Sequence, residues 1–294
     1  MEQIIGYILS IMTSIFFSIY VLPKKIVKEK TMYYTIFLTL GFLITSTILY
    51  SFFMLSGICK EMVSIPILFI LILRGLFWFL SIYVYALAIE KIGIARAVLY
   101  QSLKTPFGVI LTLFILGEFL TTNLFLIVLA TILTFLSAIL LTIKKSPNSQ
   151  INKMGIIYAV ISAILLATTN LLQKWVTNQG IVYSQHIFTA ISSVFFASFY
   201  VLLKDKNFKQ VLSMSKKSKL FSTLGGCAFY FASFLQALAY QYLPGSIVTI
   251  IVQLSAVWSV LIGIVIFKEI DLKKHWKRIS LGIVVTVLSI IILL

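Results

Sequence analysis

A lysine and a proline stand inside an apolar run of the sequence, in the segment YQSLKTPFG from Tyr100 to Gly108. A cation at the centre of a membrane-spanning helix costs about 2.5–3.5 kcal/mol on insertion scales, and such groups are functional by default. Helical spacing places Tyr100, Gln101 and Lys104 on one face, which we expect to point into a helix bundle or a wet cavity. The alternative is a structural polar cluster that locks this helix to a neighbour.

Pro106 follows this lysine by two residues. A proline removes one backbone hydrogen bond from a helix and leaves a carbonyl free. Transporter sites often use interrupted helices. We therefore expect Pro106 to loosen the helix beside Lys104 in a gating or structural role.

Arg74 lies in a second apolar run, with Trp78 one helical turn further along on the same face. An arginine can hold a carboxylate or a phosphate by two parallel hydrogen bonds. We name both residues as candidate substrate contacts. The alternative is that Arg74, about nine residues into its helix, extends its long side chain to the lipid headgroups.

The second half of the chain carries polar or aromatic side chains at a comparable depth, and the candidates are Asn170, Gln236, Gln253 and Trp258. It carries no ion at that depth. His186 lies closer to a helix end, where we expect a backbone carbonyl to hold its ring rather than a proton relay.

Acidic residues are absent from the middle of every apolar run, and Glu118 and Glu269 each close one. We interpret these two as gates or loop anchors. The two cysteines, Cys59 and Cys227, have no paired spacing and indicate neither a disulfide framework nor a metal site. Buried cations without buried carboxylates favour a substrate with negative charge, such as a carboxylate, a phosphate or a zwitterion. A neutral sugar held by amide side chains remains an alternative.

The composition of the chain indicates an integral membrane protein. Of 294 residues 61% are hydrophobic and 11% charged, whereas a soluble domain is about half apolar and a quarter charged. A net charge of +16 could indicate nucleic-acid binding, but the charges lie between the apolar runs, so we expect a lipid bilayer and no nucleic acid as partner. Ten runs are long enough to span a bilayer, near 3–22, 32–56, 65–89, 94–116, 120–143, 154–176, 181–203, 219–241, 245–267 and 277–294. The predicted fold class is all-α with ten transmembrane helices.

The distribution of basic residues between the connections predicts the orientation. The connections after the first, third, fifth, seventh and ninth runs hold 20 lysines and arginines, and the others hold only Lys60 and Lys174. Cytoplasmic loops carry the excess of positive charge. We therefore expect a multi-pass protein of the cell membrane with both termini outside the cytoplasm. The N-terminus lacks the basic region of a signal peptide, so the first run is expected to be retained.

The two halves of the sequence repeat at an offset of 151 residues. Segments 86–118 and 237–269 share seven of 33 positions, including an Ala-Leu-Ala triple and the closing glutamate. Each half, 1–145 and 152–294, holds five runs, and an odd number means that the second half enters the membrane upside down. Such inverted repeats are found in many secondary transporters, with the substrate site near the midplane.

The segment YALAIEKIGIARAVLYQSLKTPFGVILTLFILGE, with Tyr85, Pro106 and Glu118 in register, resembles the EamA-type pattern of the drug/metabolite transporter superfamily. The resemblance covers the whole chain and implies ten helices in two inverted repeats. The segment SIYVLPKK at 18–25 also looks like the start of the glucose/ribose/rhamnose porters. The orientation above departs from the usual EamA-type exporter, whose termini are generally cytoplasmic.

The expected function is therefore secondary transport of a small polar metabolite by alternating access. Nucleotide-binding loops, HExxH and serine-elbow motifs are absent, so we expect neither an enzyme nor a cofactor. The alternatives are a sugar or polyol porter and, outside solute transport, a lipid-handling or structural membrane protein. Whether a proton or sodium ion is coupled, and whether the protein is a monomer or a homodimer, is left open.

Overall fold

The computed structural model describes residues 2–20, 22–27, 29–141, 152–205, 209–265 and 272–293. Glu269 lies outside these ranges, so its expected role as a gate or anchor is not addressed. Within the described ranges the chain forms helices and no strand. The expectation of an all-α protein is confirmed.

The helices follow the apolar runs to within a few residues, because loop charges and turn residues end each run. Their bounds are α1 Glu2–Ile19, α2 Pro23–Ile26, α3 Thr31–Leu55, α4 Ile65–Ile92, α5 Ile94–Gln101, α6 Lys104–Ile115, the 3₁₀ turn η1 Glu118–Leu120, α7 Leu124–Leu141, α8 Lys153–Asn178, α9 Gln185–Asp205, α10 Lys209–Leu212, α11 Lys216–Tyr242, α12 Gly245–Val252, α13 Leu254–Val265 and α14 Leu272–Ile291.

In the described part of the chain, eight helical segments are long and apolar enough to cross a membrane. They are α1, α3, α4, the pair α5 and α6 from Arg96, α7, α8, α9 and α11. The last two expected spans lie partly outside the described residues, so they are not decided. The described part of 245–267 includes the shorter apolar segment Gly245–Ser259, and α14 begins with the basic sequence LKKHWKR.

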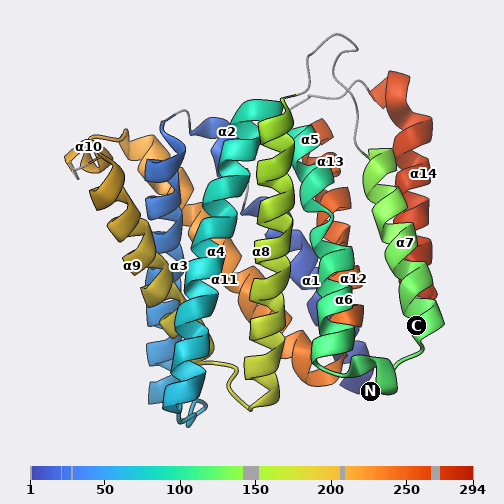
Figure 1. The fold of residues 1–294 in the computed structure, drawn as a ribbon, viewed down its shortest axis with the longest axis horizontal. Coiled ribbons are helices and arrows are strands. Elements are labelled where there is room, and N and C mark those ends of the chain that lie inside the picture. Colours follow the sequence, from blue (N-terminus) through green and yellow to red (C-terminus); the bar gives the residue numbers. More distant parts are fainter. Residues whose placement is uncertain are drawn as a thin grey trace.

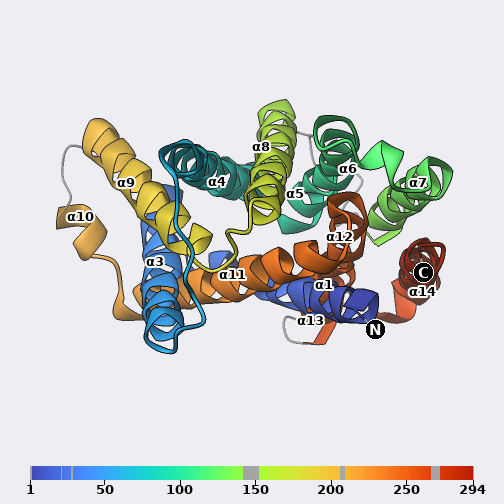
Figure 2. The ribbon, with the colours of Figure 1, turned by 90° about the horizontal axis from the view of Figure 1, so that it is seen from below.

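The long helices stand side by side in two rows (Figures 1 and 2). One row contains α4, α8, α5 with α6, and α7, while the other contains α3, α11, α1 and α13. Helix α9 joins the rows at one end through α3 and α4, and α14 packs on α7 at the other. Both termini lie at the same end of the bundle, opposite α2 and α10 (Figure 1). The site residues therefore lie between two layers of helices.

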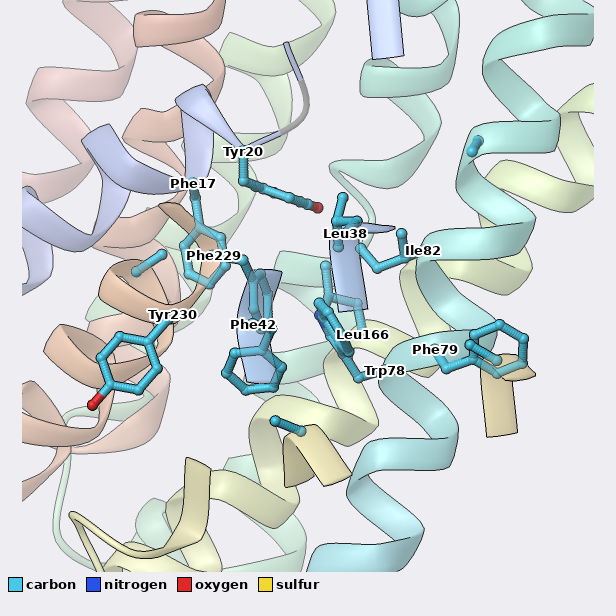
Figure 3. Close-up of a cluster of buried hydrophobic side chains, with 14 of the residues drawn as sticks. Phe17, Tyr20, Leu38, Phe42, Trp78, Phe79, Ile82, Leu166, Phe229 and Tyr230 are labelled. Carbon is cyan, nitrogen blue, oxygen red and sulfur yellow. The ribbon is translucent and has the colours of Figure 1, made fainter. Parts of the chain in front are cut away.

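The centre of the bundle is an aromatic cluster, drawn in Figure 3. The Trp78 ring lies 4.3 Å from the Phe229 ring and 4.9 Å from the Phe42 ring, centroid to centroid. Close backbone contact between α3 and α11 supports this packing: a Cβ atom added at Gly41 or Gly226 would overlap backbone atoms of the other helix. By contrast, large apolar side chains are exposed along the outer helices, as a lipid environment requires.

The expected helix 94–116 is interrupted between α5 and α6 at Ser102 and Leu103. Pro106 has no N–H to give to the carbonyl of Ser102, which accepts the N–H of Thr105 at 3.1 Å instead. The expectation that Pro106 disturbs the helix beside Lys104 agrees with this geometry. The span 245–267 is also interrupted, at Gln253, although it has no proline there.

Candidate polar site

A small cavity of about 30 Å³ lies where the two interrupted spans meet. Its lining combines side chains of α1, α4, α5, α6 and α13 with the two helix breaks, and contains Phe17, Tyr20, Tyr85, Val98, Gln101, Ser102, Lys104, Gln253, Ser255, Ala256 and Ser259. A cavity needs about 10–15 Å³ to hold one water molecule. This one therefore has room for one or two waters, and we call it the Lys104 cavity.

Lys104 is the charged residue of this cavity. Its Nζ lies 5.6 Å from the centroid of the Phe17 ring. Among the described residues it makes no ion pair, since the single ion pair found there joins Lys24 to Glu90. A cation needs compensation when water is removed from it, and an aromatic face supplies only part of that. The ammonium group is thus placed to attract an anion.

Two amides predicted as site residues lie beside Lys104. Gln101 donates from Nε2 to the Ser162 hydroxyl of α8 at 3.4 Å. Gln253 accepts a hydrogen bond from the Thr105 hydroxyl at 2.7 Å, which ties one helix break to the other. Both amides are buried and line the cavity. The structure therefore brings Lys104, Gln101 and Gln253 together as expected.

Arg74 lies in a different polar cluster, between α4, α9 and α11, and is 1% exposed. Its Nη1 donates to Gln185 Oε1 at 3.1 Å and to the Thr189 hydroxyl at 3.2 Å, and its Nη2 donates to the Ser233 hydroxyl at 3.0 Å. The alternative that it reaches the lipid headgroups is wrong. Arg74 also does not line the Lys104 cavity.

One face of α4 connects these two places. Arg74, Trp78 and Tyr85 follow one another at spacings of four and seven residues, and Tyr85 lines the Lys104 cavity. At 1.5 Å per residue, Arg74 stands about 16 Å along the helix from Tyr85. Trp78 lies between them, fully buried in the aromatic cluster (Figure 3). Aromatic packing therefore separates the Lys104 cavity from the Arg74 cluster.

The remaining predicted residues lie elsewhere. Tyr100 packs against the apolar cluster of α4, α5 and α8 that contains Tyr85, and it does not line the cavity itself. Trp258 donates from its indole nitrogen to the Ser14 hydroxyl of α1 at 2.9 Å. Asn170 is buried in α8 but does not line the Lys104 cavity. Gln236 lies in α11 and donates to the Tyr240 hydroxyl at 2.8 Å.

His186 differs from the expectation that a backbone carbonyl would hold its ring. It is fully buried, and within the described ranges neither ring nitrogen has a hydrogen-bond partner. The ring packs edge-on against Tyr230 at 5.5 Å and Phe234 at 5.8 Å. The expectation failed because α9 begins at Gln185 and turns the ring inward against α11.

Glu118 is an anchor, and its partner is distant in sequence. Its carboxylate accepts the backbone N–H of Gly245 at 2.5 Å and that of Ser246 at 2.9 Å, at the start of α12. Lys174 of α8 donates to the carbonyls of Tyr240, at 2.6 Å, and Leu243, at 3.1 Å, where α11 ends. A carboxylate at a helix start and an ammonium at a helix end both match the helix dipole. Together they hold the turn between α11 and α12.

Other glutamates act in the same way at other helix starts. Glu61 accepts the N–H groups of Val182, Tyr183 and Ser184 just before α9, at 2.7–3.2 Å. Glu29 accepts hydroxyls from Ser215 and Ser218 at the start of α11. Sequence reasoning missed Lys174 and Glu61, because neither a lysine in one helix nor a carboxylate in a loop shows which distant helix end it will contact.

The described residues contain no group of three or more histidine, cysteine or acidic side chains that could hold an ion. Cys59 and Cys227 are free thiols.

Comparison with known proteins identifies a fold and no family. The sequence matches no family model and no curated protein. Among solved structures 28 chains match. One of them, described only as "Crystal structure of protein", has a TM-score of 0.75 and 12% identity over 98% of this chain and 95% of that chain. At this identity the similarity shows the fold alone.

Proposed function

We propose that this protein is a secondary transporter that moves a small anionic or zwitterionic metabolite across a cell membrane through the Lys104 cavity. The observation that carries the proposal is a lysine without an ion pair among the described residues, lining a polar cavity between two interrupted spans. Interrupted helices at mid-depth are a common feature of transporter sites.

Two inverted repeats, 1–145 and 152–294, are part of this proposal. The bounds of α5, Ile94–Gln101, and α12, Gly245–Val252, differ by 151 residues at both ends, the offset found in the sequence. The breaks that follow them, at Ser102 and Gln253, differ by the same offset. Matching breaks in both halves support ten spans related by an internal repeat.

The placement of the cavity supports alternating access. Its lining draws Tyr85, Gln101 and Lys104 from the first repeat, and Gln253 and Ser255 from the second. A rocking of one repeat against the other would change its width. Since the cavity now has room for one or two waters only, we propose that it widens to admit a metabolite.

A sugar or polyol porter is the second candidate. The amides of Gln101 and Gln253 and the rings of Tyr20 and Tyr85 line the same cavity, and such groups suit neutral hydroxyls. A lipid-handling or structural role would give no solute uptake at all.

Uptake into proteoliposomes tests these proposals, with small carboxylates, amino acids, organic phosphates and sugars as substrates. We expect uptake of an anionic or zwitterionic compound, and a loss of at least tenfold in Lys104→Gln, because one ionic hydrogen bond contributes about 1.5–3 kcal/mol. Lys104→Arg keeps the charge and should retain more activity, while the exposed Lys60→Gln should behave as wild type. Unchanged uptake in Lys104→Gln would refute the role of the cation, and uptake of sugars alone would favour the second candidate.

The proposal also includes the orientation of the chain in the membrane. The excess of lysine and arginine in alternate connections supports cytoplasmic placement of α2 and α10 and external placement of both termini. An alkaline phosphatase fusion at the C-terminus would then be active outside the cell. An inactive fusion would contradict this orientation.

A further inference from the structure

The Arg74 cluster contains more hydrogen-bonding groups than it uses. An arginine has five N–H donors, and the hydrogen bonds to Gln185, Thr189 and Ser233 account for three. The N–H on Nε has no partner among the described residues. Two donors of one guanidinium, Nε–H and one on Nη2, therefore remain unused.

Neighbouring side chains add further unused groups. Both ring nitrogens of His186, which follows the Arg74 partner Gln185, lack a hydrogen bond within the described ranges. So does Oε1 of Gln236, one turn along α11 from the Arg74 partner Ser233. All three side chains are at most 1% exposed. Buried polar atoms without partners are rare, and each calls for an explanation.

The positive charge of the cluster also calls for an explanation. Within the part of the chain that the structure describes, Arg74 has only neutral oxygens as hydrogen-bond partners and no ion pair. A buried cation without a counter-charge is costly. Two parallel N–H groups on a guanidinium match the two oxygens of one carboxylate, and a neutral imidazole can donate one further hydrogen bond.

We propose that Arg74, His186 and Gln236 form a second binding site, closed in this structure, for the carboxylate of a small organic acid. Arg74 and His186 donate to the carboxylate, and Gln236 Oε1 accepts from an amino or hydroxyl group on the same molecule. The site lies beyond Trp78 as seen from the Lys104 cavity, so that a substrate moving along the face of α4 would meet the two cations in turn. The inference rests on the proposed function for this transport role, but not for the binding itself.

His186→Phe is the decisive variant. Phenylalanine keeps the ring that packs on Tyr230 and Phe234, and no hydrogen bond of the present structure is lost. Replacing an unsatisfied polar group by an apolar one of similar shape is near neutral or stabilising. The variant should therefore fold as wild type, and a purely structural role for the ring predicts the same. Only the proposed site predicts that the variant loses carboxylate binding.

The experiment measures the thermal unfolding midpoint of the purified full chain against sodium acetate and glycine, with sodium chloride and ribose as controls. We expect acetate and glycine to raise the midpoint of the wild type, with glycine the more effective, and to act at least tenfold more weakly on His186→Phe. Arg74→Lys, which keeps the charge but loses the planar fork, should show the same weakening. No rise in the wild type, an equal rise with chloride, or an unchanged response in His186→Phe would overturn the proposal.

Lys104→Gln separates this inference from the proposed function. In that variant the acetate and glycine response should remain, since Lys104 lies in the other polar cluster, whereas uptake should fall. A retained response without any solute uptake would leave the second site standing and refute transport. Uptake that depends on Lys104, without a rise of the unfolding midpoint in acetate or glycine, would support transport and refute the second site.

Discussion

Replacing Glu118 by alanine should destabilise the protein strongly. The substitution removes two hydrogen bonds from backbone N–H groups to a buried carboxylate, at 2.5 and 2.9 Å. Hydrogen bonds to charged groups contribute about 1.5–3 kcal/mol each. It also removes the negative charge beside Lys174. We expect a loss of about 3–5 kcal/mol in the free energy of unfolding.

Thermal unfolding in detergent can measure this loss. At about 2 °C per kcal/mol for a chain of this size, the midpoint should fall by roughly 6–10 °C. Glu118→Gln keeps one acceptor oxygen and should lose about half as much. Glu2→Gln, an exposed glutamate at the start of α1, is the matched control and should shift the midpoint by little.

A double-mutant cycle with Lys174→Met tests whether the two charges act as one unit. Lys174 holds the end of α11 and Glu118 the start of α12, so both substitutions free the same turn. The double variant should therefore lose less stability than the two single losses added together. If Glu118→Ala unfolds within 1–2 °C of wild type, or if the losses simply add, then the carboxylate is not an important cap and the reasoning fails.

Two further predictions concern packing and pH. Gly226→Ala should prevent stable folding or cost several kcal/mol, because its Cβ would overlap the backbone of α3 near Leu38. Size-exclusion profiles of the fluorescently tagged protein would show the loss of folded protein. The control is Gly57→Ala, where no atom lies near the added Cβ, so that it reports the cost of the positive φ alone. Hydrogen bonding from the Ser218 hydroxyl, the largest cause, lowers the pKa of Glu29 from its ordinary value of 4.5. Its contribution to stability is therefore complete above the unfolded pKa and is lost as the pH falls through the lower folded pKa. The Glu29→Gln midpoint should approach that of wild type in that acidic range, and a constant difference between them would contradict the assignment.

Positions of the helices were predictable because each depends on local sequence. Apolar runs of about 20 residues in a low-charge chain must form helices in a bilayer, since every backbone group needs an internal partner there. The disturbance beside Lys104 was predictable from Pro106 for the same local reason. The break at Gln253 was not, because no residue in α12 or α13 forbids a helix. There the side chain of Thr105, from the other half of the chain, meets Gln253.

The candidate site was predictable in its residue types and only partly in its geometry. The sequence by itself determined that Lys104 and Arg74 stand inside apolar runs without a deep carboxylate to pair with either, and it left open whether Arg74 reaches the lipid headgroups. Only the tertiary structure decided that they occupy two clusters separated by Trp78. It also decided that Glu118 caps a helix 127 residues away and that the His186 ring faces α11. The place of a residue within an apolar run follows from composition along one segment, whereas its burial and its partners depend on the packing of helices far apart in the chain.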